Sequence, residues 1–308
     1  MITTPTVLVL GAGAGYPYGF PTARELKERI SEAFASPTEK AAQLLGGEES
    51  QYTPQEFFEF REAFLRSPAS IDAFLLRRHN FLSVGKLAIA YCLIPFENEV
   101  SLYYPPDRNL RGGNWYEYLS DKLDSSFEEF SNNKLSIITF NYDRSLEVYL
   151  LNYLLNHHGK KYDECANALA QIPIIHVYGQ LGEIPYPQKG CIKYRPNQIE
   201  YFIYVKTAAD GIKLYHEEAE AASTAARELL LAAKRICFLG FGYHAFNMER
   251  LNIGGSLDLS TTIIGTTRGL IGMEKEAAKN RVSGALGGDV HFKGEDSLNV
   301  LRETMFLD

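Results

Sequence analysis

A strand that leads directly into a glycine-rich loop is the feature that most constrains this chain. The apolar residues 7–10 are followed by Gly-Ala-Gly-Ala-Gly at residues 11–15, and a helical segment begins near Thr22. Glycines let backbone N–H groups approach an anion that a Cβ atom would hold away, and the following helix offers its positive N-terminal end. This order favours a nucleotide ligand, and the alternative is a tight strand-to-helix turn that binds nothing.

The loop departs from the two best-known phosphate-binding patterns. The dinucleotide fingerprint requires a third glycine three residues after the second, and Tyr16 occupies that position. The phosphate loop of ATPases ends in Gly-Lys-Ser or Gly-Lys-Thr, and this loop has no such ending. An ordinary dehydrogenase and a P-loop ATPase are therefore disfavoured.

Further apolar runs recur along the chain, with helical stretches between them. They are continuous rather than alternating, which is typical of a parallel sheet covered on both faces. With 308 residues, 45% of them hydrophobic, the chain can bury the core of a large domain. We predict a single α/β domain over residues 1–308, a doubly wound and mainly parallel Rossmann-like sheet. The predicted strands are residues 7–10, 135–140, 172–177, 235–241, 261–266 and 290–293.

Residues 37–130 interrupt this rhythm, and we predict a helical insert there, after the first strand–helix unit. The residues from Thr53 to Glu56 have the pattern of a capping box with proline in the first turn, which predicts the start of a helix. Another helix is expected to open at Ser70. The phenylalanines of the insert recur at helical spacing, and core packing is the favoured interpretation: they are Phe57, Phe58, Phe60, Phe64 and Phe74.

Charge and composition argue against several classes of function. The net charge of −7 argues against a nucleic-acid-binding surface, because neutralising phosphates requires clustered Lys and Arg. No uninterrupted apolar run has the length of a membrane span, and residues 1–5 lack the basic region of a signal peptide. We therefore expect a cytoplasmic protein that binds neither nucleic acid nor membranes.

The cysteines are widely spaced, and none forms a Cys-x-x-Cys pair. This spacing predicts neither a zinc site nor a disulfide framework, so no bound metal is expected. Buried thiols are the favoured interpretation. The four cysteines are Cys92, Cys165, Cys191 and Cys237.

A second feature stands at the end of the strand predicted at residues 135–140. The sequence from Thr139 to Asp143 puts Asn141 and Asp143 beyond the carboxyl end of a strand, where ligands bind in open α/β sheets. An amide bonds ribose hydroxyls through both its donor and its acceptor, and a carboxylate stabilises developing positive charge. The alternative is that these side chains cap the following helix, and the sequence leaves both open.

A histidine ends the next predicted strand. Alternation puts His176 and Tyr178 on one face, and an imidazole there takes or gives a proton near neutral pH. A structural histidine satisfied by its neighbours is the alternative. Two later strand exits contain small residues that let a backbone approach a bound nucleotide: Gly240 and Gly242 in one, Gly265 and Thr266 in the other.

Taken in order, these features resemble the sirtuin family. The glycine loop, the Gly-Phe-Pro-Thr-Ala-Arg stretch at residues 19–24, the Asn141 motif, the His176 strand and the Gly240 strand occur in sirtuin order. The Phe-Asn-Tyr-Asp form and the Ser-Ile-Asp-x-Phe-Leu stretch from Ser70 are most similar to bacterial sirtuin-like proteins of the phage-defence type. The resemblance covers nearly the whole chain and implies a Rossmann-like domain that binds NAD.

The chain departs from the sirtuin pattern at several positions. Gly15 stands where sirtuins usually have serine, and Thr22 and Ala23 replace an Asp-Phe pair, although Arg24 is kept. The four-cysteine zinc module of deacylases is also missing, so the resemblance implies no zinc and disfavours deacylation.

The histidine of the family motif has two possible matches. In sirtuins the catalytic histidine directly precedes a glycine, whereas here Tyr178 precedes Gly179 and His176 lies two residues earlier. His158, followed by Gly159, is the competing match. It follows a helical run in which Gly159 has the position of a C-cap, so the strand context favours His176.

By this resemblance, the protein is an NAD glycohydrolase that cleaves the nicotinamide–ribose bond through an oxocarbenium-like state. The resemblance also implies an antiphage effector that forms a homo-oligomer and is controlled by its oligomeric state or by a partner protein encoded elsewhere. The alternatives are an ADP-ribosyltransferase or deacylase on the same site, or a non-catalytic NAD sensor.

The resemblance also implies a role for each site residue. Asn141 would orient the ribose and the attacking water, Asp143 would contact the departing nicotinamide, and His176 would act on ribose hydroxyls or accept the proton. The helical insert would close over the site. The other residues expected to bind NAD are Gly11, Ala12, Gly13 and Arg24 at the diphosphate, Gly240, Gly242 and Thr266 at the adenosine, and Thr139, Phe140 and Tyr142 beside Asn141.

Overall fold

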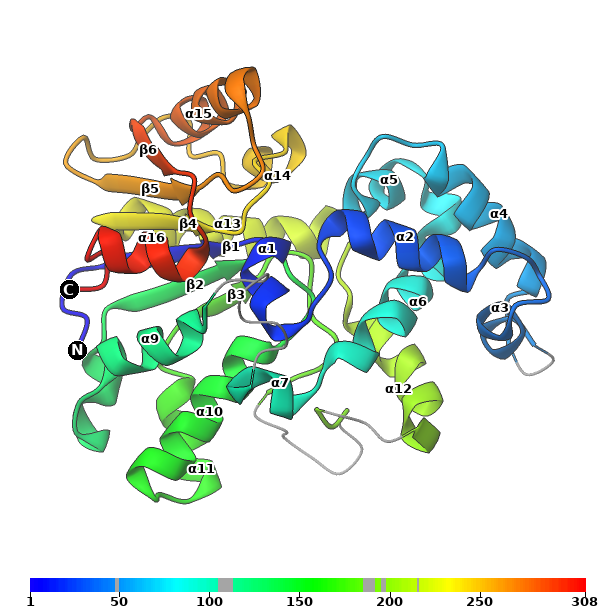
Figure 1. The fold of residues 1–308 in the computed structure, drawn as a ribbon, viewed down its shortest axis with the longest axis horizontal. Helices are drawn as coiled ribbons and strands as arrows, with labels where there is room; N and C mark the ends of the chain where they lie inside the picture. Colours follow the sequence, from blue (N-terminus) through cyan, green and yellow to red (C-terminus); the bar gives the residue numbers. More distant parts are fainter. Residues whose placement is uncertain (48–49, 105–112, 185–191, 195–197, 215) are drawn as a thin grey trace.

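The fold is built on one parallel β-sheet. A computed structural model describes residues 1–47, 50–104, 113–184, 192–194, 198–214 and 216–308. Within these residues, six parallel strands form a sheet in the order β3-β2-β1-β4-β5-β6 (Figure 1). This is the order of the doubly wound Rossmann-type sheet, so the predicted fold class is confirmed. The strands are β1 (Thr6–Leu10), β2 (Leu135–Thr139), β3 (Ile174–His176), β4 (Arg235–Leu239), β5 (Thr262–Thr266) and β6 (Val290–Lys293).

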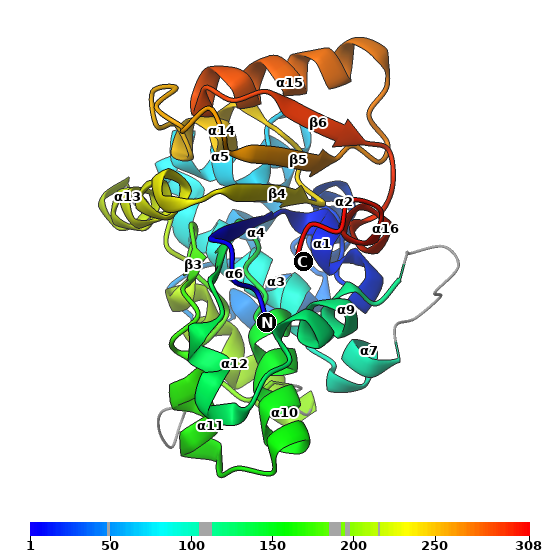
Figure 2. The ribbon, with the colours of Figure 1, turned by 90° about the vertical axis from the view of Figure 1, so that its left-hand side faces the viewer.

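A hydrophobic core lies on each face of the sheet. Successive side chains of a strand point to opposite faces, and Val7 and Val9 belong to one core whereas Leu8 and Leu10 belong to the other. We call these the Val7 core and the Leu8 core. Figure 2 shows α13 (His216–Ala232) and α16 (Ser297–Glu303) on opposite sides of the strands. A strand buried on both faces is apolar throughout, which explains the continuous runs in the sequence.

Four strands are shorter than predicted, β2 and β5 by one residue each and β3 and β4 by more, and local chemistry explains the two larger differences. β3 begins at Ile174 rather than at residue 172, because Pro173 has no N–H to donate to a neighbouring strand. β4 ends at Leu239 because Gly240 turns the chain with a left-handed φ of +58°. The sheet otherwise follows the predicted strands closely.

The stretch predicted as a helical insert contains helices that divide between the two cores. Helices α3 to α6 pack with α2 in the Val7 core, whereas α7, α9 and η4 pack in the Leu8 core. Helix α12, which is distant in sequence, lies beside α6 (Figure 1). These elements are α2 (Ala23–Ala33), α3 (Lys40–Leu45), α4 (Pro54–Leu65), α5 (Ile71–Arg77), η2 (His79–Phe81), α6 (Leu82–Leu93), η3 (Ile94–Phe96), α7 (Glu99–Tyr103), α9 (Trp115–Leu123), η4 (Phe127–Asn132) and α12 (Gln198–Gly211).

Capping chemistry begins α4 as predicted. Thr53 Oγ1 accepts from the Glu56 N–H at 3.3 Å, and the Glu56 carboxylate accepts from the Thr53 N–H at 2.7 Å. Four of the five phenylalanines singled out in the sequence are buried, and Phe58 is half-buried. Their predicted core packing is therefore confirmed. The remaining helices are α1 (Ala12–Gly15), η1 (Tyr16–Tyr18), α10 (Ser145–His158), α11 (Tyr162–Leu169), α14 (Ala245–Arg250) and α15 (Gly272–Leu286).

One helical stretch, His79–Phe96, is long and apolar enough to cross a membrane by length and composition alone. More than half of it is buried inside the fold, which is how the core helix of a soluble protein is positioned.

Cys92 lies in this stretch and is free and buried, as are Cys165 and Cys237. Cys191 lies outside the described residues.

Candidate functional site

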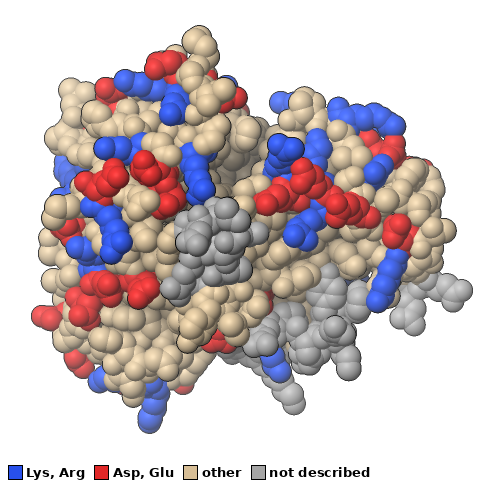
Figure 3. Space-filling model, viewed as in Figure 1, with Lys and Arg blue, Asp and Glu red and all other residues tan. Residues whose placement is uncertain are grey.

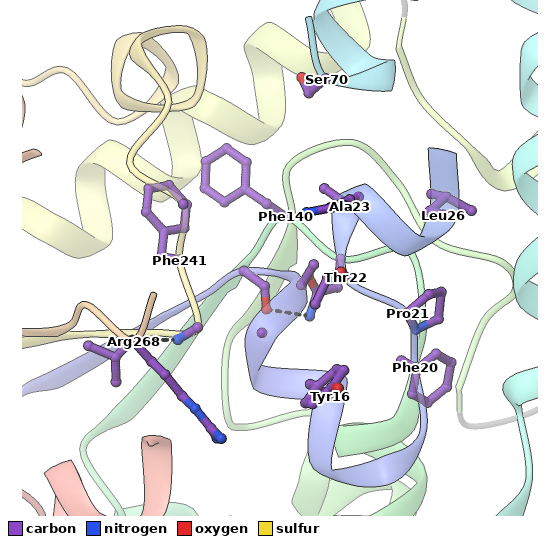
Figure 4. A pocket seen from close by; sticks show the side chains of 18 of the residues that line it. Tyr16, Phe20, Pro21, Thr22, Ala23, Leu26, Ser70, Phe140, Phe241 and Arg268 are labelled. Atoms are coloured by element: carbon purple, nitrogen blue, oxygen red, sulfur yellow. Dashed lines mark hydrogen bonds between the residues drawn. The ribbon is translucent and has the colours of Figure 1, made fainter. Parts of the chain in front are cut away.

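A cavity of about 550 Å³ opens at the carboxyl ends of the strands. It lies where β1 and β4 pair and the strand order reverses, which is where open α/β sheets bind ligands. Its volume is within the usual range for small-molecule sites. In Figure 4, Tyr16, Phe20 and Pro21 line one side, Arg268 extends from the end of β5 on another, and Ser70 approaches from α5.

The two glycine loops touch each other beside this cavity. The Gly11 N–H donates to the Leu239 carbonyl and the Gly13 N–H to the Gly240 carbonyl, both at 3.0 Å. A Cβ atom on Gly13 would lie 2.8 Å from Gly240 Cα, and one on Gly240 would lie 2.1 Å from the Ala14 nitrogen. The glycines therefore permit backbone contact between the loops, and the Gly13 N–H is already engaged there rather than open to a phosphate.

Asn141 joins the exits of β1 and β2. One amide hydrogen donates to the Gly11 carbonyl at 3.1 Å, and the Asn141 backbone N–H donates to Thr139 Oγ1 at 3.1 Å. Asn141 lines the cavity together with Phe140 and Tyr142, whereas Thr139 is buried behind them. A second amide hydrogen and the amide oxygen of Asn141 can still serve a ligand.

Asp143 both caps a helix and lines the cavity. Its Oδ1 accepts from the Ser145 N–H at 3.1 Å and from the Ser145 hydroxyl, at the start of α10. Ser145 Oγ lies 2.7 Å from the Tyr116 hydroxyl. Because the Ser145 proton goes to Asp143, Tyr116 is the donor to Ser145. Burial raises the pKa of Asp143, and these hydrogen bonds oppose that rise. Asp143 therefore holds the first residue of α10 and also lines the cavity, and its role toward a ligand stays a prediction.

His176 lies behind Asn141. Its Nδ1 is 2.9 Å from the Asn141 carbonyl oxygen, and its Nε2 is 2.6 Å from Glu147 Oε1. Its side chain is only 7% exposed, and the described residues that line the cavity do not include it. Burial opposes the charged imidazole, but Glu147 and the Asn141 carbonyl outweigh it and raise the pKa of His176. This geometry gives His176 a positioning role rather than direct access to a ligand.

His158 and Tyr178, the other two residues at the positions of the family's histidine motif, are not among the described residues that line the cavity either. His158 lies at the last residue of α10, and Gly159 is the left-handed C-cap, as the sequence indicated. The helix has 14 residues, so His158 is roughly 20 Å from the first turn that holds Asp143. Tyr178 is buried, and its hydroxyl donates to Asn247 Oδ1 at 3.0 Å. Asn247 in turn lines the cavity.

The exits of β4 and β5 form the far wall. The Gly240 N–H donates to Thr266 Oγ1 at 2.8 Å, and Gly240, Gly242 and Thr266 all line the cavity. The Tyr243 hydroxyl donates to the Thr266 carbonyl at 2.9 Å, which fastens the β5 exit to the β4 exit. Three of the four small residues singled out here therefore lie on the cavity wall, and the described lining does not include Gly265.

Arg24 lines the cavity mouth, but its side chain is 89% exposed and pairs with Glu28 at 3.0 Å. Several other polar residues that line the cavity had no predicted role. One of them, Asp72, belongs to the Ser-Ile-Asp stretch at the start of α5, which the sequence singled out only for the family resemblance. These residues are Asp72, His244, Asn247, Arg268 and Glu295.

On the face seen in Figure 3, described Lys and Arg side chains are interspersed with Asp and Glu side chains. Such mixing gives no strong field of one sign on that face. Among the described residues, no group of three or more His, Cys, Asp and Glu side chains is arranged to hold a metal ion.

Comparison with known proteins adds no family assignment. No protein-family model matches the chain, and a search of curated proteins finds no significant match. The sirtuin-like resemblance therefore stays a prediction, and the function is argued from the cavity.

Proposed function

We propose that the protein binds NAD in this cavity and hydrolyses the nicotinamide–ribose bond. The observation that carries the proposal is that Asn141 and Asp143 line one cavity with residues of both glycine loops, at the point where the strand order reverses. A site at this point of the sheet suits a dinucleotide. The many apolar and aromatic lining residues suit the flat rings of such a ligand, and a few polar side chains suit its orientation.

Hydrolysis requires the bond between ribose C1′ and the nicotinamide nitrogen to break. Nicotinamide leaves with the bonding electron pair, and the ribose passes through a state with positive charge near C1′. A carboxylate in a cavity of low dielectric stabilises such charge. Asp143 is held by Ser145 and lines the cavity, which supports this role.

The attacking water forms the new bond to C1′ and loses a proton. Asp143 is the candidate acceptor, because burial raises its pKa and so makes it a better base. Asn141 would orient the water or the ribose hydroxyls through its remaining amide groups. His176 would act by fixing the Asn141 backbone, because both of its ring nitrogens are already engaged.

The sirtuin-like resemblance also suggests a cellular role for this activity. It favours an antiphage effector whose NAD consumption is controlled by self-assembly or by a partner protein. Activity that rises with protein concentration supports control by self-assembly. Activity that is independent of concentration argues against it.

The test is release of nicotinamide and ADP-ribose from NAD by the purified protein, at low and high protein concentration. We expect release by the wild type and a loss of about 100-fold or more in Asn141→Ala, because orientation at the reacting carbon is removed. NAD binding measured in parallel separates catalysis from affinity. Binding without release at any concentration favours an NAD sensor, and an ADP-ribosylated acceptor favours a transferase. Absence of both binding and release contradicts the proposal.

A further inference from the structure

Asp72 is a polar group of the cavity to which the catalytic scheme gives no role. It is the second residue of α5, and it lines the cavity with Ser70 and Ile71. Ser70 caps the helix by accepting from the Ala73 N–H at 3.4 Å. Figure 4 shows Ser70 approaching the cavity from α5. The helical insert therefore supplies this carboxylate to the edge of the sheet.

Packing holds α5 in one position. Phe74 of this helix is buried, and its ring lies 5.2 Å from that of Phe64 and 6.1 Å from that of Phe60, both in α4. Aromatic contacts of this kind fix the helix that carries them. Asp72 is therefore on a rigid element, as a ligand-binding group requires.

A hydrogen bond joins Asp72 to the loop of Asn141 and Asp143. The hydroxyl of Tyr142, a buried residue, donates to Asp72 Oδ1. Burial raises the pKa of Tyr142 well above its ordinary value, so the phenol stays protonated and is the donor. Asp72 therefore belongs to the same framework as the two residues at the centre of the proposed site.

The chemistry of a carboxylate limits which part of a ligand it can meet. Burial raises the pKa of Asp72, and the hydrogen bond from Tyr142 opposes that rise. In its ionised form the carboxylate accepts at two oxygens and donates at neither, and Tyr142 uses Oδ1. An ionised carboxylate also repels a phosphate. In NAD, the ribose hydroxyls and the carboxamide donate hydrogen bonds, and the nicotinamide ring is cationic.

We infer that Asp72 is a substrate-binding residue that accepts from the nicotinamide–ribose half of NAD, so that this half lies between α5 and the loop of Asn141. The inference rests on the proposed function and deepens it. In the orientation that this inference predicts, the diphosphate of NAD is directed away from Asp72 and Asp143.

The test is the affinity of Asp72→Asn for NAD, ADP-ribose and ADP, measured by calorimetry. The variant keeps the shape of the side chain, and its amide oxygen still accepts from Tyr142. The negative charge is lost, and the second oxygen, which would accept from NAD, becomes an NH2 donor. We expect NAD affinity to fall by about tenfold or more and ADP affinity to be unchanged. A loss shared by NAD and ADP-ribose assigns the contact to the ribose, and a loss for NAD alone assigns it to the nicotinamide.

Asp163→Asn is the matched control. Asp163 is the second residue of α11, as Asp72 is of α5, and it is exposed. We expect this control to bind all three ligands like the wild type. Equal losses for NAD and ADP in Asp72→Asn, or unchanged NAD affinity, overturn the inference. A wild type that binds NAD without releasing nicotinamide contradicts only the hydrolase, whereas one that binds no NAD overturns both.

Discussion

His176 has two hydrogen-bond partners, and both are acceptors. The Asn141 carbonyl has no proton to give, and an ionised Glu147 has none either. A neutral imidazole has one N–H, so satisfying both partners requires the doubly protonated ring. Held in this way, His176 cannot accept a further proton, and its contribution is to fasten the Asn141 backbone to α10.

The charge on His176 predicts a pH-dependent stability. Its pKa is raised in the folded protein, because Glu147 and the Asn141 carbonyl outweigh the cost of burial. The resulting stabilisation is complete below the unfolded pKa of about 6.5 and is lost as the pH rises through the higher folded pKa. We expect His176→Gln to lower the free energy of unfolding by on the order of 3 kcal/mol at low pH, and by less at high pH.

Urea unfolding between about pH 5.5 and pH 8.5 measures this difference, in the range where histidine titrates. His79→Gln removes a histidine from an exposed position and controls for the substitution itself. A deficit of His176→Gln that grows with rising pH would contradict the doubly protonated ring.

At the scale of elements, the exits of β1 and β4 form a single unit. Gly11 and Gly13 follow β1, Gly240 follows β4, and their backbones are in direct contact. Gly240 also has a φ of +58°, which residues with a Cβ adopt at a cost. The shape of the cavity therefore depends on three positions that tolerate only glycine.

We predict that Gly240→Ala destabilises the protein by more than about 3 kcal/mol, because its Cβ would clash with the backbone of Gly13 and Ala14. Gly284→Ala is the matched control. Gly284 lies inside α15, and a Cβ there would meet nothing within 4 Å. Alanine should stabilise that helix by roughly 0.5–1 kcal/mol. Thermal unfolding of the two variants measures both effects, and similar midpoints would refute the contact between the loops.

The same elements explain what could be predicted from the sequence. The buried strands and the capping box at Thr53 have local patterns, so their positions were predicted well. The pairing of His176 with Glu147 joins residues 29 positions apart, and that of Tyr142 with Asp72 joins residues 70 apart. No local periodicity reports such pairs. The sequence therefore indicated Asn141, Asp143 and His176, but not the carboxylates of Glu147 and Asp72 that pair with His176 and Tyr142.

At the scale of the whole molecule, a buried ion pair joins the start of α10 to the helical insert. Arg144 precedes α10, which packs in the Leu8 core. Glu97 follows η3, which contributes Ile94 to the Val7 core and packs Phe96 against the Leu8 core. Both side chains are fully buried, and the guanidinium contacts both carboxylate oxygens, at 2.9 and 2.8 Å. Arg144 also donates to the Ile192 carbonyl at 2.8 Å. Because Arg144 follows Asp143, this pair anchors the proposed site to the insert.

Removing one partner of this buried pair should lower the free energy of unfolding by far more than the intact pair contributes to it. Glu97→Gln removes the carboxylate that contacts the buried Arg144 guanidinium through both of its oxygens, and we expect a loss of about 3–5 kcal/mol in the free energy of unfolding. Glu28→Gln is the matched control, because Glu28 pairs with Arg24 at the surface, where such pairs contribute about 1 kcal/mol or less. Adding Arg144→Met to Glu97→Gln should recover part of the loss, because the buried guanidinium charge is then removed as well. Chemical denaturation of the single and double variants measures this coupling, and additive losses would contradict it.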